Sequence, residues 1–223
     1  MIEYKTCVSI AETSPKRLLA TLKKALKKSD YAELRLDFLD PNDVPEALQI
    51  AKKQLKRCVC TLRPKSEGGR FEGSEKNRRS IIRLIAEYNP HLIDIEFSTL
   101  REDKKLLAYV RSTKTPILVS WHDFKKTPPF SALEKKLEVM RKISKFVKIV
   151  TTAKSAKDST TVLSLYRKQE KSLIAFAMGG PGRITRILCM HLGSPYTYVS
   201  LGKAIAPGQF SLDEVKSLLA LQK

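Results

Sequence analysis

The sequence predicts an α/β protein whose eight strand–helix units close into a (β/α)8 barrel, with residues 1–223 forming a single domain. Short apolar segments rich in β-branched residues alternate with amphipathic segments along the whole chain. Eight such pairs fit in 223 residues, a suitable length for one barrel. No change in composition marks a linker, and a hydrophobic content of 42% is enough for a sizeable core. A doubly wound open sheet is the structural alternative.

The expected elements follow from the apolar periodicity and from the residues that start and stop helices. The strands are expected at residues 6–10, 32–38, 58–62, 92–96, 115–120, 145–150, 173–177 and 196–200. Helices are expected from 14, from 43 to 55, and over 74–88, 101–112, 130–143 and 156–170, then up to 191 and after 210. Ser14 and Pro15 fit an N-cap and a first helical residue, and Gly193 fits a helix stop.

The formal charge of +19 comes from 42 Lys and Arg against 23 Asp and Glu. Lys23, Lys24 and Lys27 decorate a helix whose other side carries Leu18 and Leu22. This pattern is typical of the solvated side of an amphipathic helix, so we expect no nucleic-acid partner. No run of 18 apolar residues is present, and the first residues lack the layout of a signal peptide, so we expect a cytoplasmic protein without membrane contact.

The four cysteines are expected to be buried and reduced. Cys7, Cys58 and Cys60 fall in predicted strands and Cys189 in a predicted helix. The Cys58–Cys60 spacing lacks the two-residue gap of a zinc knuckle or a redox motif. Histidines and carboxylates likewise show no spacing typical of metal ligands, so neither a metal nor another cofactor is expected.

Lys148 lies in the middle of the apolar strand at 145–150. A lysine is rarely buried there unless something stabilises it or uses it. One interpretation is a strand-end lysine whose stem reaches solvent. The other is a nucleophilic amine, desolvated to lower its pKa, that forms a Schiff base with a carbonyl substrate.

Active sites of barrels lie at the carboxyl ends of the strands. His122 ends the strand before that of Lys148, and neighbouring strands lie about 4.8 Å apart, so both side chains are expected to meet one substrate. Histidine is suited to moving protons near neutral pH. Asp94 is expected to accept a hydrogen bond from His122 and fix its tautomer. His91 and His191 are expected to be structural.

Other polar side chains follow the strand ends: Ser9, Glu33, Arg35, Asp37, Arg63, Glu67, Glu96, Arg186 and Gln209. Strand alternation places Glu33, Arg35 and Asp37 on one face, either as groups of an active site or as a buried salt-bridge layer. The glycine-rich segment from Met178 precedes a helix without matching a P-loop or a dinucleotide fingerprint, and a carboxylate held by Arg186 would fit there.

Taken together, these residues make the chain closely resemble type I 3-dehydroquinate dehydratases, the Schiff-base enzymes of the shikimate pathway. The resemblance covers nearly the whole chain and depends on the order of its motifs and their positions at strand ends. The motifs are Glu33–Asp37, Arg63 with Glu67–Gly69, Ile93–Glu96, Ser120–Phe124, Lys148, Met178–Gly179, Thr185–Arg186 and Ala206–Gln209.

The resemblance implies a lyase that converts 3-dehydroquinate to 3-dehydroshikimate, the third step of that pathway, as a homodimer without a cofactor. Lys148 would form an imine with the ring ketone, and His122 would remove the neighbouring proton and help protonate the departing hydroxyl. Glu67 would assist near the leaving group. The implied substrate contacts are Glu33, Arg35 and Arg63 to hydroxyls and ring, Arg186 to the carboxylate, Met178 to the ring, Gln209 as a lid residue and Ser9 to a hydroxyl.

Three positions depart from the bacterial pattern of this family. Ile205 stands where a serine is common before Ala-Pro-Gly-Gln, Phe176 where a second methionine is common, and Thr185 where a serine is usual. The Ile205 departure puts a hydroxyl contact from the lid in doubt. Two other functions are kept as alternatives: a class I aldolase acting on a sugar phosphate, and a basic protein that binds polyanions.

Overall fold

The computed structural model describes residues 4–168 and 172–220 and shows an α/β fold. Its strands are β1 (Thr6–Ile10), β2 (Tyr31–Arg35), β3 (Cys58–Thr61), β4 (Leu92–Glu96), β5 (Ile117–His122), β6 (Phe146–Thr152), β7 (Leu173–Met178), β8 (Thr197–Ser200) and β9 (Phe210–Ser211). The strand order is β7-β6-β5-β4-β3-β2-β1-β8-β9. Successive strands are neighbours and β8 lies beside β1, which is the order of a (β/α)8 barrel. The predicted fold class is confirmed, because a doubly wound sheet would reverse its order at a switch point.

Helices follow the strands along the chain. They are α1 (Pro15–Leu26), α2 (Val44–Ala51), α3 (Glu75–Glu87), α4 (Phe97–Glu102), α5 (Lys104–Ser112), α6 (Phe130–Arg141), α7 (Ala156–Leu163), α8 (Thr185–His191) and α9 (Leu212–Ala220). Short 3₁₀ segments are η1 (Leu36–Phe38), η2 (Pro41–Asp43), η3 (Lys52–Arg57), η4 (Lys65–Glu67) and η5 (Ser164–Lys168). No helix among the described residues is both long and apolar enough to cross a membrane.

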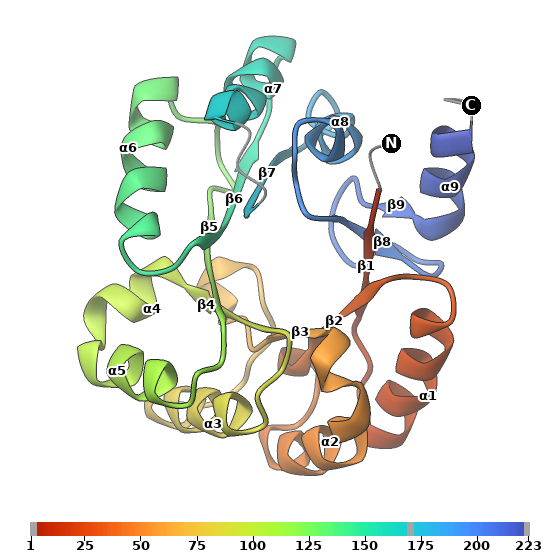
Figure 1. The fold of residues 1–223 in the computed structure, drawn as a ribbon, viewed down its shortest axis with the longest axis vertical. Helices are drawn as coiled ribbons and strands as arrows, with labels where there is room; N and C mark the ends of the chain where they lie inside the picture. Colours follow the sequence, from red (N-terminus) through yellow and green to blue (C-terminus); the bar gives the residue numbers. More distant parts are fainter. Residues whose placement is uncertain (1–3, 169–171, 221–223) are drawn as a thin grey trace. The chain divides into compact units, whose positions relative to one another are not determined.

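The chain divides into two compact units, residues 9–118 and residues 1–8 with 119–223. In the first unit, β2, β3 and β4 pair in parallel, and the register aligns Arg35 with Thr61 and Thr61 with Asp94. Helices α1 and α2 pack against each other outside β2 and β3 (Figure 1). Their buried sides include Leu18 and Leu48. A single domain over 1–223 stays a prediction.

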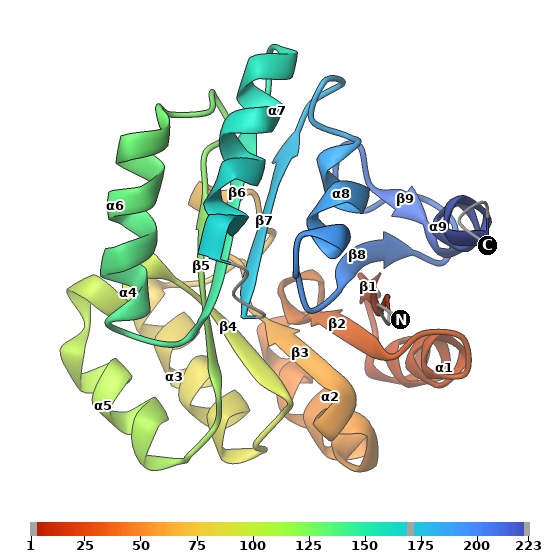
Figure 2. The same ribbon diagram turned by 45° about the horizontal axis from the view of Figure 1, so that its top comes forward.

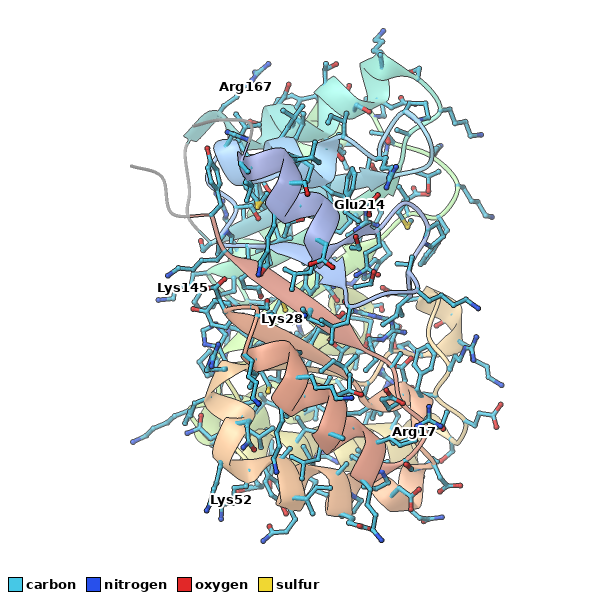
Figure 3. The ribbon with its side chains drawn as sticks, turned by 90° about the vertical axis from the view of Figure 1, so that its right-hand side faces the viewer. Arg17, Lys28, Lys52, Lys145, Arg167 and Glu214 are labelled. Carbon is cyan, nitrogen blue, oxygen red and sulfur yellow. The ribbon has the colours of Figure 1, made fainter. Side chains whose placement is uncertain are left out.

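The lysine-rich helix surfaces of this first unit face solvent, as predicted. The side chains of Arg17 on α1, of Lys28 after it and of Lys52 at the start of η3 are exposed (Figure 3). The lysines of α1 are exposed, whereas Leu18 and Leu22 on the opposite side are fully buried.

In the second unit, β6 and β7 run side by side over their whole length (Figure 2). The register pairs Lys148 with Ile174 and Thr152 with Met178. Helices α6 and α7 pack beside these strands (Figure 2). Parallel pairing of β1 with β8 and of β8 with β9 completes the sheet in this unit. The two-residue strand β9 was not predicted, because it is too short to give a periodic signal.

Several boundaries differ from the predictions. Strand β2 ends at Arg35 and the chain turns into η1, so Asp37 does not share a strand with Glu33. The helix predicted over 101–112 is two helices, because Asp103 breaks the run and accepts a hydrogen bond from Leu106 N at 2.8 Å as the N-cap of α5.

Three more helices are tighter or shorter than predicted. The segment after Asp43 leaves the α conformation at Ala51 and continues as η3. The segment predicted over 156–170 leaves the α conformation at Leu163 and continues as η5. Its residues 169 and 170 lie outside the described part of the chain, and so do residues 1–3, where no signal peptide was predicted. Helix α6 ends at Arg141 instead of 143.

The predicted helix signals are mostly confirmed. Pro15 is the first residue of α1, and Ser14 has the extended backbone of an N-cap, although its side chain makes no capping hydrogen bond. Gly193 follows α8 with φ of +110°, a conformation that favours glycine and ends the helix.

Candidate active site

Lys148 is buried in β6 and does not reach solvent along its stem. Its exposed fraction is 6%, and its strand neighbours Val147 and Ile149 are fully buried. Nζ lies 4.2 Å from the centroid of the Tyr198 ring, which β8 contributes. The solvent-reaching interpretation is therefore wrong, because only 6% of the side chain is exposed, and the role of Lys148 as a nucleophile stays a prediction.

His122 ends β5, and hydrogen bonds fix this end against the carboxyl end of β6. Asp123 N donates to Val150 O at 2.8 Å, and Thr152 Oγ1 donates to Asp123 O at 2.9 Å. The His122 ring is half-buried and stacks on Phe124, with centroids 5.8 Å apart and an interplanar angle of 16°. The two strands that carry the predicted acid–base group and the predicted nucleophile thus end at the same edge.

Arg186 lies in the first turn of α8 with an exposed fraction of 2%. Its guanidinium carbon lies 4.3 Å from the centroid of the Phe176 ring, so this ring offers a face for the cation. Nη2 donates to Pro207 O at 3.1 Å, which ties Arg186 to the loop before β9. The turn before α8 is tight, because a Cβ on Gly182 would lie 2.4 Å from Met178 O.

The loop before β9 is held by one of its own residues. Gln209 is 6% exposed, and its Oε1 accepts hydrogen bonds from Ile205 N at 3.0 Å and from Ala206 N at 3.4 Å. Position 205 contributes its backbone to this contact, so the loop shape does not depend on a serine there. Met178 ends β7 and is 7% exposed.

In the unit formed by residues 9–118, Glu33 is held by two hydroxyls. Ser9 Oγ donates to Oε2 at 2.8 Å and Thr61 Oγ1 donates to Oε1 at 3.1 Å. The carboxylate is 5% exposed. Ser9 therefore orients Glu33. This contact was not predicted, since Ser9 was expected only to contact the substrate.

Arg35 and Asp37 form a two-pronged ion pair, with Nε–Oδ1 and Nη2–Oδ2 distances of 2.8 Å each. Asp37 also accepts a hydrogen bond from Arg70 N at 2.9 Å. The guanidinium groups of Arg35 and Arg70 lie 5.1 Å and 4.7 Å from the centroid of the Phe38 ring. The turn at η1 brings the side chain of Asp37 back towards Arg35, so Asp37 orients Arg35. Through its bond to Arg70 N, Asp37 also anchors the loop after β3.

Arg63 is held by two buried carboxylates. Its Nη2 donates to Asp94 Oδ2 and its Nη1 to Glu96 Oε1, both at 2.7 Å. Glu96 in turn accepts a hydrogen bond from Arg78 Nη1 at 2.8 Å. Asp94 and Glu96 thus belong to a buried ion-pair network, an arrangement that was predicted as an alternative only for Glu33, Arg35 and Asp37. Asp94 as a partner of His122 stays a prediction.

Glu67 lies in η4 and accepts a hydrogen bond from Ser98 Oγ at 3.1 Å. Burial raises the pKa of Glu67 to about 7, and the negative charges of Glu96 and Asp94 act in the same direction. Arg63 and the Ser98 hydrogen bond oppose this increase. A carboxyl group that titrates near neutral pH can both release and accept a proton there.

Sequence reasoning missed Tyr198, Thr61 and Arg78. Tyr198 and Thr61 lie in strands and look like ordinary core residues, since their contacts come from distant parts of the chain. Arg78 is three residues after Glu75 on α3, a spacing typical of a surface ion pair. All four cysteines are buried, and none of them is in a disulfide in the part of the chain that the structure describes. Among residues 4–168 and 172–220, no group of three or more His, Cys, Asp or Glu side chains is placed to hold a metal ion.

Comparisons with known proteins agree over nearly the whole length of the chain. The 3-dehydroquinate dehydratase of Pyrobaculum aerophilum is 39% identical over 227 residues, which cover 99% of this chain and 73% of that protein. That of Methanocaldococcus jannaschii is 34% identical over 220 residues, which cover 96% and 97%.

Solved structures show the same fold. The 3-dehydroquinate dehydratase from Aquifex aeolicus VF5 has a TM-score of 0.79 and 30% identity, with 96% of both chains covered. The one from Geobacillus kaustophilus HTA426 has a TM-score of 0.87 at 24% identity, with 98% of this chain and 91% of that chain covered. Residues 6–223 match the family of type I 3-dehydroquinases. The chain therefore belongs to the type I 3-dehydroquinase family.

Proposed function

We propose that this chain dehydrates 3-dehydroquinate to 3-dehydroshikimate through a covalent imine on Lys148. The observation that carries this proposal is a lysine only 6% exposed in an apolar strand, with His122 at the end of the neighbouring strand. A buried amine is the group that forms a Schiff base, and a histidine nearby can move the protons. Family membership and the names of the relatives support the substrate.

The reaction conserves atoms and charge. Nζ of the neutral Lys148 amine adds to the ring ketone, and uptake of one proton with loss of one water gives an iminium ion. His122 takes a proton from the carbon next to the iminium, and the electron pair of that bond moves towards nitrogen to give an enamine. The enamine then expels the hydroxyl of the next carbon, which leaves as water with the proton carried by His122. Hydrolysis of the remaining iminium consumes one water and frees the product, Lys148 and the proton taken up in the first step, so the net change is loss of one water.

Tyr198 supports the same steps. The iminium nitrogen carries positive charge, and the face of an aromatic ring attracts a cation. With the ring centroid 4.2 Å from Nζ, the ring lies where it would stabilise the iminium that withdraws electrons during proton removal. The hydroxyl of Tyr198 has no necessary part in this effect.

Substrate contacts are assigned to each unit separately. In the unit containing Lys148, Arg186 takes the carboxylate, Met178 contacts the ring and Gln209 closes its loop. In the unit of residues 9–118, the proposed contacts are Glu33, Arg35 and Arg63 to hydroxyls and ring, with Ser9 orienting Glu33. Glu67 assists proton transfer near the leaving group, which its pKa of about 7 supports.

Borohydride trapping tests the covalent step. The protein is incubated with 3-dehydroquinate and borohydride, and peptide mass spectrometry locates the reduced adduct. We expect the adduct on Lys148 and loss of both adduct and turnover in Lys148→Ala. Lys145→Ala is the matched control, because Lys145 precedes the same strand but is exposed and packs on Phe146. Full turnover of the wild type with no adduct would overturn the mechanism.

We further propose that the chain works as a homodimer in the cytoplasm. Ile184, Leu188 and Leu192 are exposed by 50%, 39% and 39%, and their spacing of four residues forms an apolar stripe from the residue before α8 to the residue after it. A second copy covering this stripe would remove it from water. Light scattering after size-exclusion chromatography is expected to give twice 25.2 kDa, and Leu188→Glu is expected to return the mass to 25.2 kDa.

A further inference from the structure

Arg78 is a charged side chain with no part in the mechanism above, yet it is almost completely buried. It lies on α3, and its exposed fraction is 1%. A cation is buried at this level only when its hydrogen-bonding groups are satisfied. Its contacts therefore indicate what the fold uses it for.

Each of the five N–H donors of Arg78 has an acceptor. Two bonds of 2.8 Å go to Glu75 at the start of the same helix, from Nε and from Nη2. Nη2 also donates to Thr99 Oγ1 at 2.6 Å. Nη1 donates to Glu96 Oε2 at 2.8 Å and to Leu62 O at 3.1 Å. The guanidinium thus joins α3 to the ends of β3 and β4.

Two of these contacts converge on Arg63. Leu62 O belongs to the residue directly before Arg63, so Arg78 holds the backbone from which that side chain extends. Glu96 binds Arg78 through Oε2 and Arg63 through Oε1, so one carboxylate spans both guanidinium groups. Thr99 Oγ1 adds a contact to Glu96 Oε2 at 3.4 Å. A shift of Arg78 would therefore move both the base and the tip of Arg63.

We propose that Arg78 is a positioning residue for substrate binding: it fixes Glu96 and the Leu62 carbonyl, and these fix the orientation of the Arg63 guanidinium. The inference rests on the proposed function, in which Arg63 contacts the substrate. Arg78 acts without touching the substrate. A planar guanidinium is needed at this position, because an ammonium cannot reach Glu75, Glu96 and the Leu62 carbonyl in fixed directions.

The proposal separates binding from chemistry. Imine formation and proton removal use Lys148 and His122, which belong to the other unit and are not contacted by Arg78 in the hydrogen bonds described. A less well oriented Arg63 is therefore expected to weaken substrate binding more than it slows the reaction of the bound substrate. A purely structural role for Arg78 would lower thermal stability and leave the KM of the folded enzyme unchanged.

The test compares Arg78→Lys with Arg79→Lys. Both changes keep the charge and remove a guanidinium, but Arg79 pairs with Glu75, Glu102 and Asp103 and binds neither Glu96 nor the Leu62 carbonyl. Steady-state kinetics with 3-dehydroquinate are measured well below the unfolding midpoint, which circular dichroism gives for each variant. We expect Arg78→Lys to raise KM about tenfold with kcat within about threefold, and Arg79→Lys to match the wild type.

Thr99→Val provides a second perturbation if Arg78→Lys does not fold. Valine keeps the shape of threonine and removes only the hydroxyl that binds Arg78 and Glu96. We expect KM to rise about threefold, whereas Thr113→Val, which removes a hydroxyl bonded to Val110 O on α5, leaves KM unchanged.

Equal KM values for the wild type, Arg78→Lys and Thr99→Val would overturn the positioning role, even if the melting temperature falls. Absence of 3-dehydroquinate turnover in the wild type would instead refute the proposed function. The two failures are therefore distinguishable in one set of measurements.

Discussion

Replacing Glu67 by glutamine is expected to change how the stability of this protein depends on pH. Burial, reinforced by Glu96 and Asp94, raises the pKa of Glu67 from 4.5 to about 7. At low pH the folded and the unfolded chain both hold the proton. As pH rises from 4.5 to about 7, the carboxyl of Glu67 loses its proton first in the unfolded chain. The free energy of unfolding of the wild type therefore falls until the folded carboxyl also ionises near pH 7.

The size of the effect follows from the two pKa values. One pH unit between them corresponds to about 1.4 kcal/mol, so the interval from 4.5 to about 7 corresponds to roughly 3 kcal/mol. Glu67 is partly exposed, and water screens its neighbours, so we expect about 2 kcal/mol. Glutamine has the shape of the protonated acid and cannot ionise. The variant and the wild type should therefore be equally stable near about pH 4, with the variant more stable by about 2 kcal/mol near about pH 8.

Urea unfolding followed by far-ultraviolet circular dichroism measures the difference. The free energy of unfolding is obtained across this pH range for the wild type and for Glu67→Gln. Glu72→Gln is the control: Glu72 is on the same loop, but its hydrogen bond to Lys65 lowers its pKa. No gain in stability with rising pH is expected for that variant. If the free energy of unfolding varied with pH in the same way for the wild type and Glu67→Gln, the reasoning that burial and neighbouring carboxylates keep Glu67 protonated would be refuted.

Two further predictions concern the chemical steps. His122→Ala is expected to give the same borohydride adduct as the wild type while dehydration slows by about 10²–10⁴, because the imine needs only the amine but the elimination needs a proton carrier; wild-type kcat in this variant would remove His122 from the mechanism. Tyr198→Leu is expected to lower kcat by about tenfold through loss of the ring face at Nζ, whereas Tyr198→Phe keeps the ring and near-normal kcat; equal losses in both variants would contradict a role for the ring.

Local patterns were sufficient to predict much of this structure. Apolar, β-branched segments placed β4 at its observed bounds and located Lys148 inside β6. The rule that barrel sites lie at strand ends brought attention to Glu33, Arg63 and Arg186, and all three are buried in organised polar surroundings. These features are encoded within a few residues, so the sequence alone reveals them.

The features that were missed depend on contacts between distant residues. The turn at η1 redirects Asp37 towards Arg35, and strand alternation could not predict this because the strand ends earlier. Tyr198 meets Lys148 from a strand that is not its neighbour in the sheet. Arg78 has the spacing of a surface residue, and only the packing of α3 on β3 and β4 makes it internal.

The bond between Arg186 and Pro207 O links the proposed carboxylate-binding group to the backbone of the loop that Gln209 shapes. A guanidinium oriented by this loop binds an anion more tightly when the loop is in place. By thermodynamic linkage, a bound anion at Arg186 stabilises the loop by the same free energy by which the loop strengthens anion binding. The reciprocity makes the loop a reporter of ligand occupancy. Protease resistance of the chain around Pro207 should rise with ligand concentration along the same curve as binding.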